Sequence, residues 1–499
     1  MANDVLIIGA GPSGLFAAAE LARHGTRARL IERAVQPHHE ARATTIQAGT
    51  LEILDSIGLL PAFLESSEHI RSSRIYASDL SELRVTNYSG VDCRCQFQCV
   101  LPQYETQRIL EAHLVSLGGT VERGVTATSL EMGEIGVRVE LAHADGRVEK
   151  IQPQVVIGAG GAHSLTRGSM SELLEGATYQ GHFLVADIAM RAPLPRDESS
   201  IVCGPDGLLL LSPMPGGRWI SFLDLEETTQ SISVDQVADR VAVRLGHRCR
   251  PTDIAWVSPF RMHRRIAARL TDGRRFLIGD AAHLSSPFGG EGLNSGLHDA
   301  FDLAWKLSLV LRGYGRRSML DAYQVERSIA DNHVLAVSDQ VHSGIVSIAA
   351  AVRARREVPA VLTDPLRDAL VRNARAMIDV DYAGSPLVAA FRASGDTEAS
   401  PHAGQRYPDW THFGGTSHHL LVFGTVSGVE SLTQLSQRWS NCLQVDRDPD
   451  VDPGRAGIAA GGMVLVRPDG HIGFKAASTD GAALAALDTH LSAYLLQGE

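Results

Sequence analysis

Cysteine is scarce in this chain, with 6 among 499 residues. So few cysteines cannot form the dense disulfide framework of a small secreted domain. Three of them, Cys93, Cys95 and Cys99, lie close together, but their spacing fits no standard zinc pattern and no histidine stands close by. We therefore expect ordinary reduced thiols and no bound metal.

Excess positive charge and long apolar runs are also missing. The formal net charge is −11, which argues against nucleic acid as a partner. The N-terminal sequence MANDVLIIGAG lacks the basic segment of a signal peptide, and we expect no stretch to reach the ~18 apolar residues of a membrane span. We expect a cytoplasmic protein, monomeric or homodimeric, with no membrane partner.

What the chain does contain, near its start, is a glycine motif. Gly9, Gly11 and Gly14 follow an apolar strand predicted at 4–8 and open a predicted helix. In a G-x-G-x-x-G turn the first glycine permits the tight turn, the second lets backbone approach a pyrophosphate, and the third allows helix and strand to pack closely. The helix N-terminus then supplies amide donors to the phosphates.

A second strand, predicted at 27–31, ends in Glu32. A carboxylate at this place can accept hydrogen bonds from ribose hydroxyls. It favours an adenosine with a free 2′-hydroxyl, as in FAD or NAD, over NADP. The alternative for Glu32 alone is a solvated strand end.

A later motif separates FAD from NAD. A strand predicted at 275–279 runs into Gly279-Asp280, and a glycine-rich turn at 289–292 then leads into a long helix. Asp280 can accept a hydrogen bond from a polyol hydroxyl. Glycines remove side chains where a flat ring must lie against backbone. The helix start favours negative charge, which a reduced flavin carries on its pyrimidine edge.

With these two motifs in this order, the chain resembles the class A flavoprotein monooxygenases, the para-hydroxybenzoate hydroxylase family. The stretch RFLIGDAAHLSSPFGGEGLNSGLHDAFDLAWKL at 275–307 carries most of the resemblance. It looks most like the branch that acts on polyketides and other natural-product aromatics. The resemblance implies FAD as cofactor, NADPH or NADH as reductant, and hydroxylation of an electron-rich ring through a hydroperoxide at flavin C4a.

The resemblance also implies site residues, although it names no catalytic base. The ADP half of FAD would be bound by Gly9, Gly11, Pro12, Ser13, Gly14, Glu32 and Arg33. The pyrophosphate and ribityl chain would be contacted by Arg42, Gln103, Gly279 and Asp280, and the isoalloxazine by Pro287, Gly290, Gly292, Leu293 and Asn294. Alternatively, Arg42 is a surface arginine and Gln103 a polar residue at a helix start. His283 is better interpreted as structural than as a base.

The fold class that follows is α/β, with three domains. A Rossmann-like FAD-binding domain of the GR2 type would comprise 1–175 and 266–395, including a helical segment at 319–395. A mixed β-sheet at 176–265 would bind substrate, with pocket-roof candidates Pro213, Met214, Trp219 and Phe222 that could equally be plain core. Residues 396–499 resemble the thioredoxin-like appendage of larger members. They hold no CxxC, which favours a role in packing or dimerisation.

One departure from the family pattern affects the functional hypothesis. The family carries an Asp-Gly pair in a pattern like GADGxxSxVR, and Gly160 stands here at the aspartate position, while Arg167 remains. That motif helps with both FAD and the nicotinamide cofactor in the family. Losing the carboxylate raises an alternative, an FAD-bound cyclase that folds a polyene or polyketide for [4+2]-type ring closure without electron flow. A third hypothesis is an FAD-holding binding or repressor-like protein.

Overall fold

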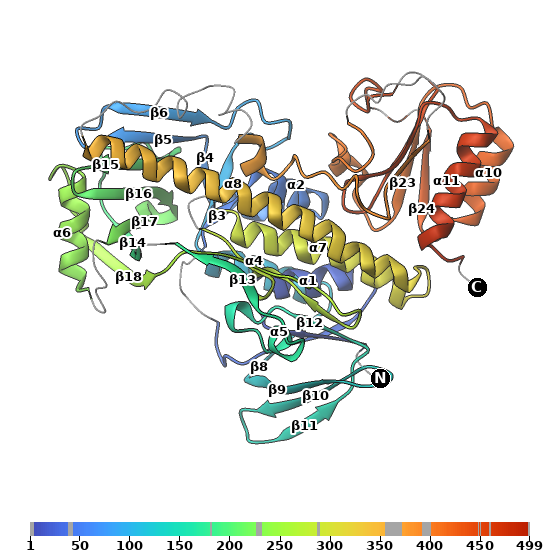
Figure 1. The fold of residues 1–499 in the computed structure, drawn as a ribbon, viewed down its shortest axis with the longest axis horizontal. Helices are drawn as coiled ribbons and strands as arrows, with labels where there is room; N and C mark the ends of the chain where they lie inside the picture. The colour runs from blue at the N-terminus through green and yellow to red at the C-terminus, as the bar shows by residue number, and fades with distance from the viewer. Residues whose placement is uncertain are drawn as a thin grey trace.

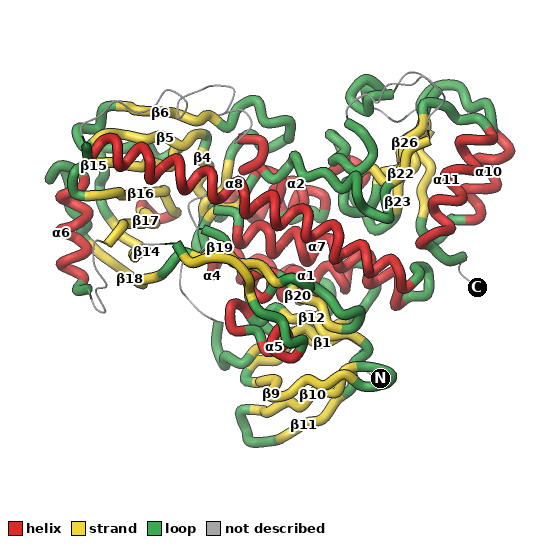
Figure 2. Tube along the Cα trace, in the orientation of Figure 1, coloured by secondary structure: helices red, strands yellow, loops and turns green. Residues whose placement is uncertain are grey.

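The computed structural model describes residues 4–37, 43–179, 182–225, 232–286, 290–354, 372–391, 401–447, 449, 451–458 and 461–497. Figures 1 and 2 show a central α/β region, a broad β-sheet on one side of it and a C-terminal α/β unit on the other. Two long helices, α7 (Gly292–Leu311) and α8 (Asp321–Arg353), cross the middle of the molecule.

The central region is built on a parallel sheet with the strand order β20-β12-β1-β2-β8. Its strands are β1 (Val5–Ile8), β2 (Ala28–Glu32), β8 (Val121–Arg123), β12 (Val155–Gly158) and β20 (Arg275–Leu277). The strands predicted at 4–8, 27–31 and 275–279 are thus confirmed. The central strands β1 and β12 are apolar throughout because both faces of a parallel sheet are covered, whereas β2 carries Arg29 and Glu32 and is only partly buried.

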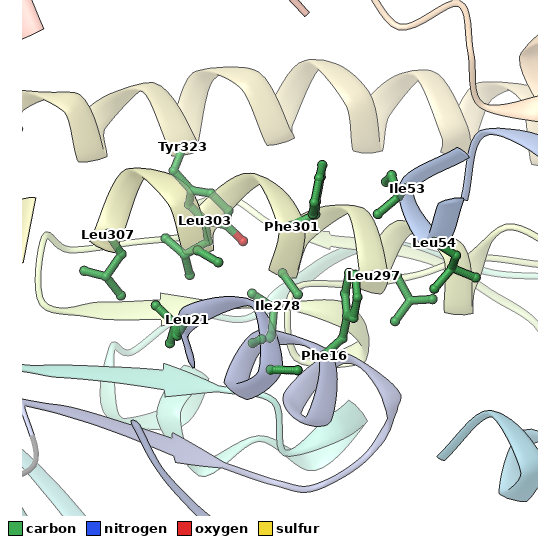
Figure 3. Packing of buried hydrophobic residues seen from close by; sticks show 14 of the residues in the cluster. Phe16, Leu21, Ile53, Leu54, Ile278, Leu297, Phe301, Leu303, Leu307 and Tyr323 are labelled. Atoms are coloured by element: carbon green, nitrogen blue, oxygen red, sulfur yellow. The ribbon is translucent and has the colours of Figure 1, made fainter. Parts of the chain in front are cut away.

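Helices α1 (Pro12–Arg23), α4 (Gln103–Ser116) and α7 lie on one side of this sheet. Figure 3 shows Phe16 of α1 toward Leu297 and Phe301 of α7, and Leu21 of α1 toward Leu303 and Leu307 of the same helix. On the other side, apolar residues of a small antiparallel sheet pack against Leu6, Ile31 and Val156. That sheet comprises β9 (Val125–Met132), β10 (Val137–His143) and β11 (Val148–Ile151).

The broad sheet has seven strands in the order β18-β14-β17-β16-β15-β5-β6. They are β5 (Ser72–Ala77), β6 (Glu82–Asn87), β14 (His182–Ala189), β15 (Glu198–Gly204), β16 (Gly207–Met214), β17 (Arg218–Leu225) and β18 (Asp253–Phe260). Helix α6 (Val234–Arg244) covers one face. Two strands come from 72–87, so the sheet extends beyond the segment 176–265 expected from the sequence. Since β5 pairs with the distant β15, no local pattern reveals the pairing.

Smaller elements join the central region to the broad sheet. One antiparallel sheet comprises β3 (Thr45–Ile46), β4 (Glu68–Ile70) and β7 (Gln98–Val100). Another comprises β13 (Leu174–Thr178), β19 (His263–Ala267) and β21 (His283–Leu284). The short helices are α2 (Ala48–Ser56), α3 (Leu60–Glu65) and α5 (Leu165–Ser169).

The long helix α8 corrects one expectation. The stretch Arg317–Arg353 is long and apolar enough to cross a membrane by length and composition, which the sequence analysis overlooked. Its buried residues include Glu326, Arg327 and Asp331, all ion-paired inside the protein. A buried ionic face of this kind is typical of a core helix, and we interpret α8 as one.

The C-terminal unit is a mixed sheet in the order β22-β26-β25-β23-β24. The strands are β22 (Ala389–Phe391), β23 (His418–Val422), β24 (Leu443–Arg447), β25 (Met463–Val466) and β26 (Ile472–Ala476), with helices α10 (Val429–Arg438) and α11 (Gly481–Tyr494). The predicted boundary at 395/396 lies outside the described residues, as does 355–371 of the helical segment predicted at 319–395. The described end of that segment is not helical, because Ala389–Phe391 form β22 and pair with β26 of the C-terminal sheet. The C-terminal unit therefore includes residues that the sequence analysis assigned to the FAD-binding domain.

Candidate functional site

A cavity of about 460 Å³ lies between the carboxyl ends of the central strands, the broad sheet and α8. Its size is that of a small-molecule or cofactor site. Eight of the sequence-predicted residues line it: Gly11, Pro12, Ser13, Gln103, Asp280, Gly290, Gly292 and Leu293. The two motifs, far apart in sequence, therefore meet at one site.

The glycines of the first motif have different roles. Gly9 has φ +106°, and a Cβ at Gly14 would lie 1.9 Å from the Gly9 carbonyl oxygen, so both positions require glycine. A Cβ on Gly11 would meet no described atom within 4 Å. Gly11 thus leaves backbone open to the cavity at the start of α1, whose first turn has no acidic residue. These features fit a phosphate group.

Glu32 stands beside this turn at the end of β2. Its Oε2 accepts a hydrogen bond from Ala10 N and its Oε1 one from Ala34 N, both at 2.9 Å. A carboxylate has about four acceptor sites, so acceptor capacity remains for a ribose. Neither Glu32 nor the exposed Arg33 lines the cavity itself.

The second motif forms the opposite wall. Gly279 has φ +59°, and a Cβ there would lie 2.6 Å from Ser13 Oγ, so the two motif loops touch. Gly290 also has positive φ, +72°. Gln103 is the first residue of α4, and its Oε1 accepts from Ala43 N at 3.2 Å while it lines the cavity. Both interpretations of Gln103, helix start and cavity residue, therefore hold together.

Contrary to the prediction, Asn294 does not line the cavity. It is fully buried; its Oδ1 accepts from Gln47 N at 2.9 Å, and its Nδ2 donates to Thr45 O and Gly290 O at 2.9 and 2.7 Å. The side chain points back from the first turn of α7 and holds the glycine loop in place. Arg42 and Pro287 lie outside the described residues.

His283 is structural, as predicted. It is 3% exposed, and its Nε2 lies 2.8 Å from Asp299 Oδ2. Burial alone would lower its pKa, but the carboxylates of Asp331 and Asp299 outweigh burial and raise it to about 9. Asp299 also accepts a hydrogen bond from Gly279 N at 2.8 Å. The buried pair of His283 and Asp299 therefore holds the second motif loop in place.

Two buried clusters in the described part of the chain have carboxylate and histidine atoms close enough together for a metal ion, His283 with Asp299 and Asp331, and Asp302 with Glu326 and Asp469. Arg327 ion-pairs with the first cluster, and Lys306 and Arg467 with the second. These cationic side chains already balance the negative charge of the carboxylates, which a bound metal ion would otherwise neutralise. All six cysteines are unpaired, and burial raises the pKa of Cys93 and Cys99 to about 12.

The pocket-roof candidates are corrected by strand alternation. Phe222 lines the cavity, but Trp219 faces the other side of the sheet, where it packs in the cluster beneath α6. Pro213 is buried and points to the face opposite the cavity-lining Ser212, because neighbouring residues of a strand point to opposite faces. Met214 has the same parity as Ser212 but lies at the end of β16, where it packs with Ile70 and Ile220 and does not line the cavity. Composition alone could not separate these positions.

Gly160 has φ −78° and ψ 15°, which any residue can adopt. A Cβ there would come no closer than 3.7 Å to Ser164 Cα, so the backbone would accept the family aspartate. Arg167 donates to Ala281 O at 3.0 Å and to Ala162 O at 2.5 Å. It ties the Gly160 loop to the second motif loop.

Sequence reasoning missed Glu291, which sits between two cavity-lining glycines. Its side chain is fully buried, and neither carboxylate oxygen has a hydrogen-bond partner among the described residues. Burial raises its pKa to about 7, against the opposing charge of Arg375. The sequence shows a glutamate inside a glycine-rich turn, but it does not show that this side chain is buried.

Replacing Glu291 with glutamine is expected to remove a pH dependence of stability. The unfolded carboxyl ionises near pH 4.5 and the folded one near 7, so the wild-type apoprotein loses stability as pH rises between these values and then levels off. At pH 8 Glu291→Gln should be more stable by about 3 kcal/mol, and at pH 4.5 nearly equal to wild type. Urea unfolding at both pH values measures this, with exposed Glu430→Gln as control. An equal gain at both pH values would contradict it.

Comparison with known proteins agrees with this geometry. The family model described as "FAD binding domain" matches residues 2–338. The 6-methylpretetramide 4-monooxygenase of Streptomyces rimosus is 31% identical, over 95% of this chain and 90% of the relative. The structure of aklavinone-11 hydroxylase with FAD and aklavinone has a TM-score of 0.80 at 23% identity, covering 98% of each chain. The Diels-Alderase PyrE3 of pyrroindomycin biosynthesis has a TM-score of 0.74 at 23% identity, covering 98% of this chain and 99% of that one.

Proposed function

The chain belongs to the family of FAD-binding class A aromatic hydroxylases, and from that membership we propose that it hydroxylates an aromatic polyketide intermediate with NADPH or NADH as reductant. The single observation that supports this most is the cavity itself, where the dinucleotide loop and the second motif loop share one space with the broad sheet and α8. The relative from Streptomyces rimosus, by its name, oxygenates 6-methylpretetramide.

Bound FAD, once reduced, supplies the oxygen chemistry, and the residues of this chain prepare the site. The open backbone at Gly11 and the amides of α1 would hold the pyrophosphate, and Asp280 would accept hydrogen bonds from the ribityl chain. Asn294 fixes the loop at Gly290, whose backbone would hold the flat ring. The broad sheet and α8, which line the same cavity, would enclose the substrate and exclude water.

The experiment that tests this function is anaerobic mixing of the FAD-loaded protein with NADPH and then NADH, with phenolic effectors, followed at the flavin absorbance band. Bleaching with an effector, and hydroxylated product after O2 is admitted, supports the hydroxylase. A matched variant, Gly160→Asp, restores a hydrogen-bond acceptor where the backbone has room for it. We expect NADPH to reduce the FAD of this variant about tenfold faster than the FAD of wild type, which is the effect of one added charged hydrogen bond. An unchanged rate would mean that Gly160 does not limit reduction.

A second candidate function is an FAD-bound cyclase, favoured by Gly160 alone. The fold permits it, because PyrE3, a Diels-Alderase by name, shares this architecture. A protein that holds FAD tightly but never bleaches, with any effector, would favour the cyclase over the hydroxylase. Linear polyenes would then be the substrates to test.

For the rest of the chain we propose a thioredoxin-like C-terminal unit. The order β24-β23-β25-β26, with β23 parallel to β24 and β25 antiparallel to both of its neighbours, supports this topology. Its only cysteine is Cys442, so we propose a packing role. A cytoplasmic location and a monomer or homodimer remain part of the proposal.

A further inference from the structure

Three buried polar groups that have no partner among the described residues lie together beside the cavity. Glu291 is fully buried, and neither of its carboxylate oxygens is bonded to a described atom. The Nε of Arg375 and the hydroxyl of Tyr88 are buried and unpartnered too. The Arg375 guanidinium lies 5.8 Å from the centre of the Tyr88 ring, and its charge acts on Glu291. Since buried polar groups are nearly always hydrogen-bonded, such exceptions need a physical explanation.

Glu291 belongs to the loop that would hold the flat ring of FAD. Gly290 and Gly292, on either side of it, line the cavity, and Asn294 holds this loop by donating to Gly290 O at 2.7 Å. Glu291 also immediately precedes α7, yet its side chain accepts no capping hydrogen bond from the helix. The loop thus carries a carboxyl group with unused hydrogen-bonding capacity, one residue away from the cavity-lining backbone.

Few charged groups surround this loop among the described residues. Arg375 lines the cavity and favours the ionised form of Glu291, against the larger opposing effect of burial. His283 of β21 is paired with Asp299, and His298, two turns along α7, is neutral because burial lowers its pKa to about 3. The remaining side chains that approach the loop are uncharged: Thr45, Gln47 and Ser285. Arg375 and the start of α7 are therefore the positive groups that act on this carboxyl.

A reduced flavin would bring a second negative charge to the same place. The charge lies on its pyrimidine edge, where it would be stabilised by the start of α7 and by Arg375. Two negative groups that share one set of positive partners raise each other's affinity for a proton, as two neighbouring carboxylates do. Because the site is enclosed, this repulsion is stronger than it would be in water.

We propose that Glu291 takes up one proton from solvent when the flavin is reduced, so that the net charge of the site stays the same through the reductive step. The nicotinamide donor gives two electrons and one proton to the flavin and leaves oxidised, and the ring gains one negative charge. The proton from solvent forms an O–H bond with a carboxylate oxygen of Glu291 and cancels one negative charge. The unpartnered atoms of Arg375 and Tyr88 offer hydrogen bonds to the waters that this proton must cross.

This inference rests on the proposed function only in placing the ring of FAD against the loop at Gly290. Its test needs no substrate, nicotinamide or O2. The midpoint potential of the bound FAD is measured against pH by anaerobic equilibration with reference dyes, and the slope gives the number of protons taken up per flavin. Extra proton uptake without any hydroxylation would support this inference and contradict the proposed function. Hydroxylation without extra uptake would do the reverse.

We expect wild type to take up about half a proton more per flavin than Glu291→Gln at pH 7.5, and the same number at pH 5.5, for a roughly tenfold coupling between the two charges. Burial raises the pKa of Glu291 to about 7, so below that pH the carboxyl is protonated with either form of the flavin. Just above it, only the reduced flavin keeps it protonated. At pH 9 it is ionised with both, and at a fixed dye potential the ratio of reduced to oxidised FAD should be about tenfold lower in wild type than in Glu291→Gln.

Glu52→Gln is the matched control. Burial raises the pKa of Glu52 to about 7 as well, but this carboxyl pairs with Arg406 at 3.0 Å and does not line the cavity. We expect the same proton number for Glu52→Gln as for wild type. Glu291→Asp, which keeps a carboxyl, should retain part of the extra uptake. A redox-difference infrared spectrum of wild type at pH 7.5 should gain a protonated-carboxyl band on reduction, and Glu291→Gln should lack it.

Equal proton numbers in wild type and Glu291→Gln from pH 5.5 to 9 would overturn the proposal. So would a loss of uptake in Glu52→Gln as large as that in Glu291→Gln, or a wild-type infrared spectrum without the carboxyl band. Retained FAD, read from the flavin-to-protein absorbance ratio, shows that each variant is folded. The infrared measurement on wild type tests the proposal even if a variant fails to fold.

Discussion

A Gly14→Ala variant is expected to be purified without flavin and with a lowered unfolding temperature. The new Cβ would lie 1.9 Å from the Gly9 carbonyl oxygen and 3.1 Å from the Ala159 Cβ. Neither the Gly9 carbonyl nor the Ala159 methyl group, which is fixed directly to the backbone, can move away without separating α1 from the central sheet, so the loss of stability should be about 3 kcal/mol or more. The flavin-to-protein absorbance ratio and thermal unfolding measure both effects.

Gly11→Ala is the matched control, because it adds the same methyl group three residues earlier. Gly11 has φ −68°, and its Cβ would meet no described atom within 4 Å. We expect an apoprotein as stable as wild type but with weakened FAD binding, since the methyl group occupies the space where a phosphate approaches backbone. If both variants lose stability equally, or if Gly11→Ala binds FAD normally, the division of roles between these glycines is wrong.

The parts of the fold that the sequence could predict are those with local signals. The strand, turn and helix around Gly9 to Gly14 lie within a short segment, and each residue there has one clear physical role. The second motif is equally local, so its meeting with the first could be expected. Eight of the predicted residues do line one cavity.

The parts that could not be predicted depend on contacts between distant segments. Strands β5 and β6 join the broad sheet through a pairing of Ser73 with Ser199, which no nearby residue signals. Trp219 looked like a cavity residue by type but has the wrong parity on its strand. Asn294 lies beside the cavity-lining Leu293, yet its amide is consumed in holding the Gly290 loop.

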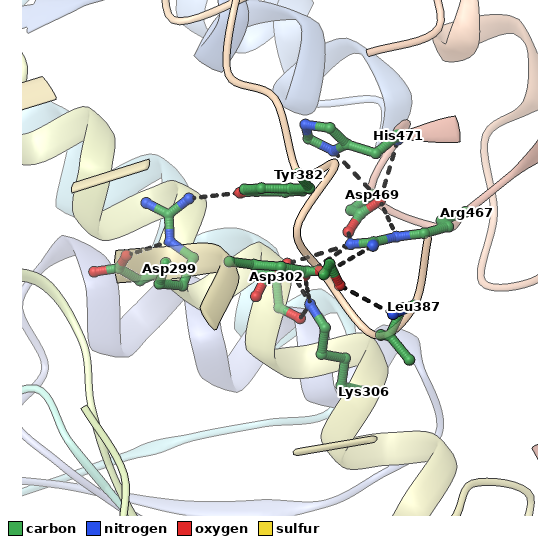
Figure 4. Close-up of polar contacts among 11 residues, drawn as sticks. Asp299, Asp302, Lys306, Tyr382, Leu387, Arg467, Asp469 and His471 are labelled. Carbon is green, nitrogen blue, oxygen red and sulfur yellow. Dashed lines mark hydrogen bonds and ion pairs between the residues drawn. The ribbon is translucent and has the colours of Figure 1, made fainter. Parts of the chain in front are cut away.

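The attachment of the C-terminal unit was also hidden from the sequence. Figure 4 shows Arg467 and Asp469, which follow β25, beside Asp302 and Lys306 of α7. Arg467 is buried, and its guanidinium donates to Glu326 of α8 at 2.5 and 2.9 Å and also to Asp469. Lys306 lies 2.7 Å from the same glutamate. The cluster is fully enclosed and joins three segments of the chain.

Arg467→Met should therefore be severely destabilising. The methionine has nearly the length of arginine but leaves Glu326 and Asp302 with Lys306 alone as cationic partner, and Asp469 with the imidazole of His471, among the described residues of the cluster. Removing one partner of a buried ion pair costs about 3–5 kcal/mol, because the other charge stays buried without compensation. Urea unfolding measures the loss, and limited proteolysis shows whether the C-terminal unit separates first.

The control for Arg467 is Arg455→Met, in the same unit. Arg455 bonds Asp92 at 2.8 Å and lies 3.3 Å from Asp409, but its side chain is 43% exposed. An exposed pair contributes about 0–1 kcal/mol, so this variant should unfold nearly as wild type does. If the two variants were equally stable, the buried cluster would not be what holds the C-terminal unit to α7 and α8. A large difference in the free energy of unfolding between the two variants would mean that buried ion pairs hold the C-terminal unit to α7 and α8. Those ion pairs would then be the physical basis of the packing role proposed for this unit.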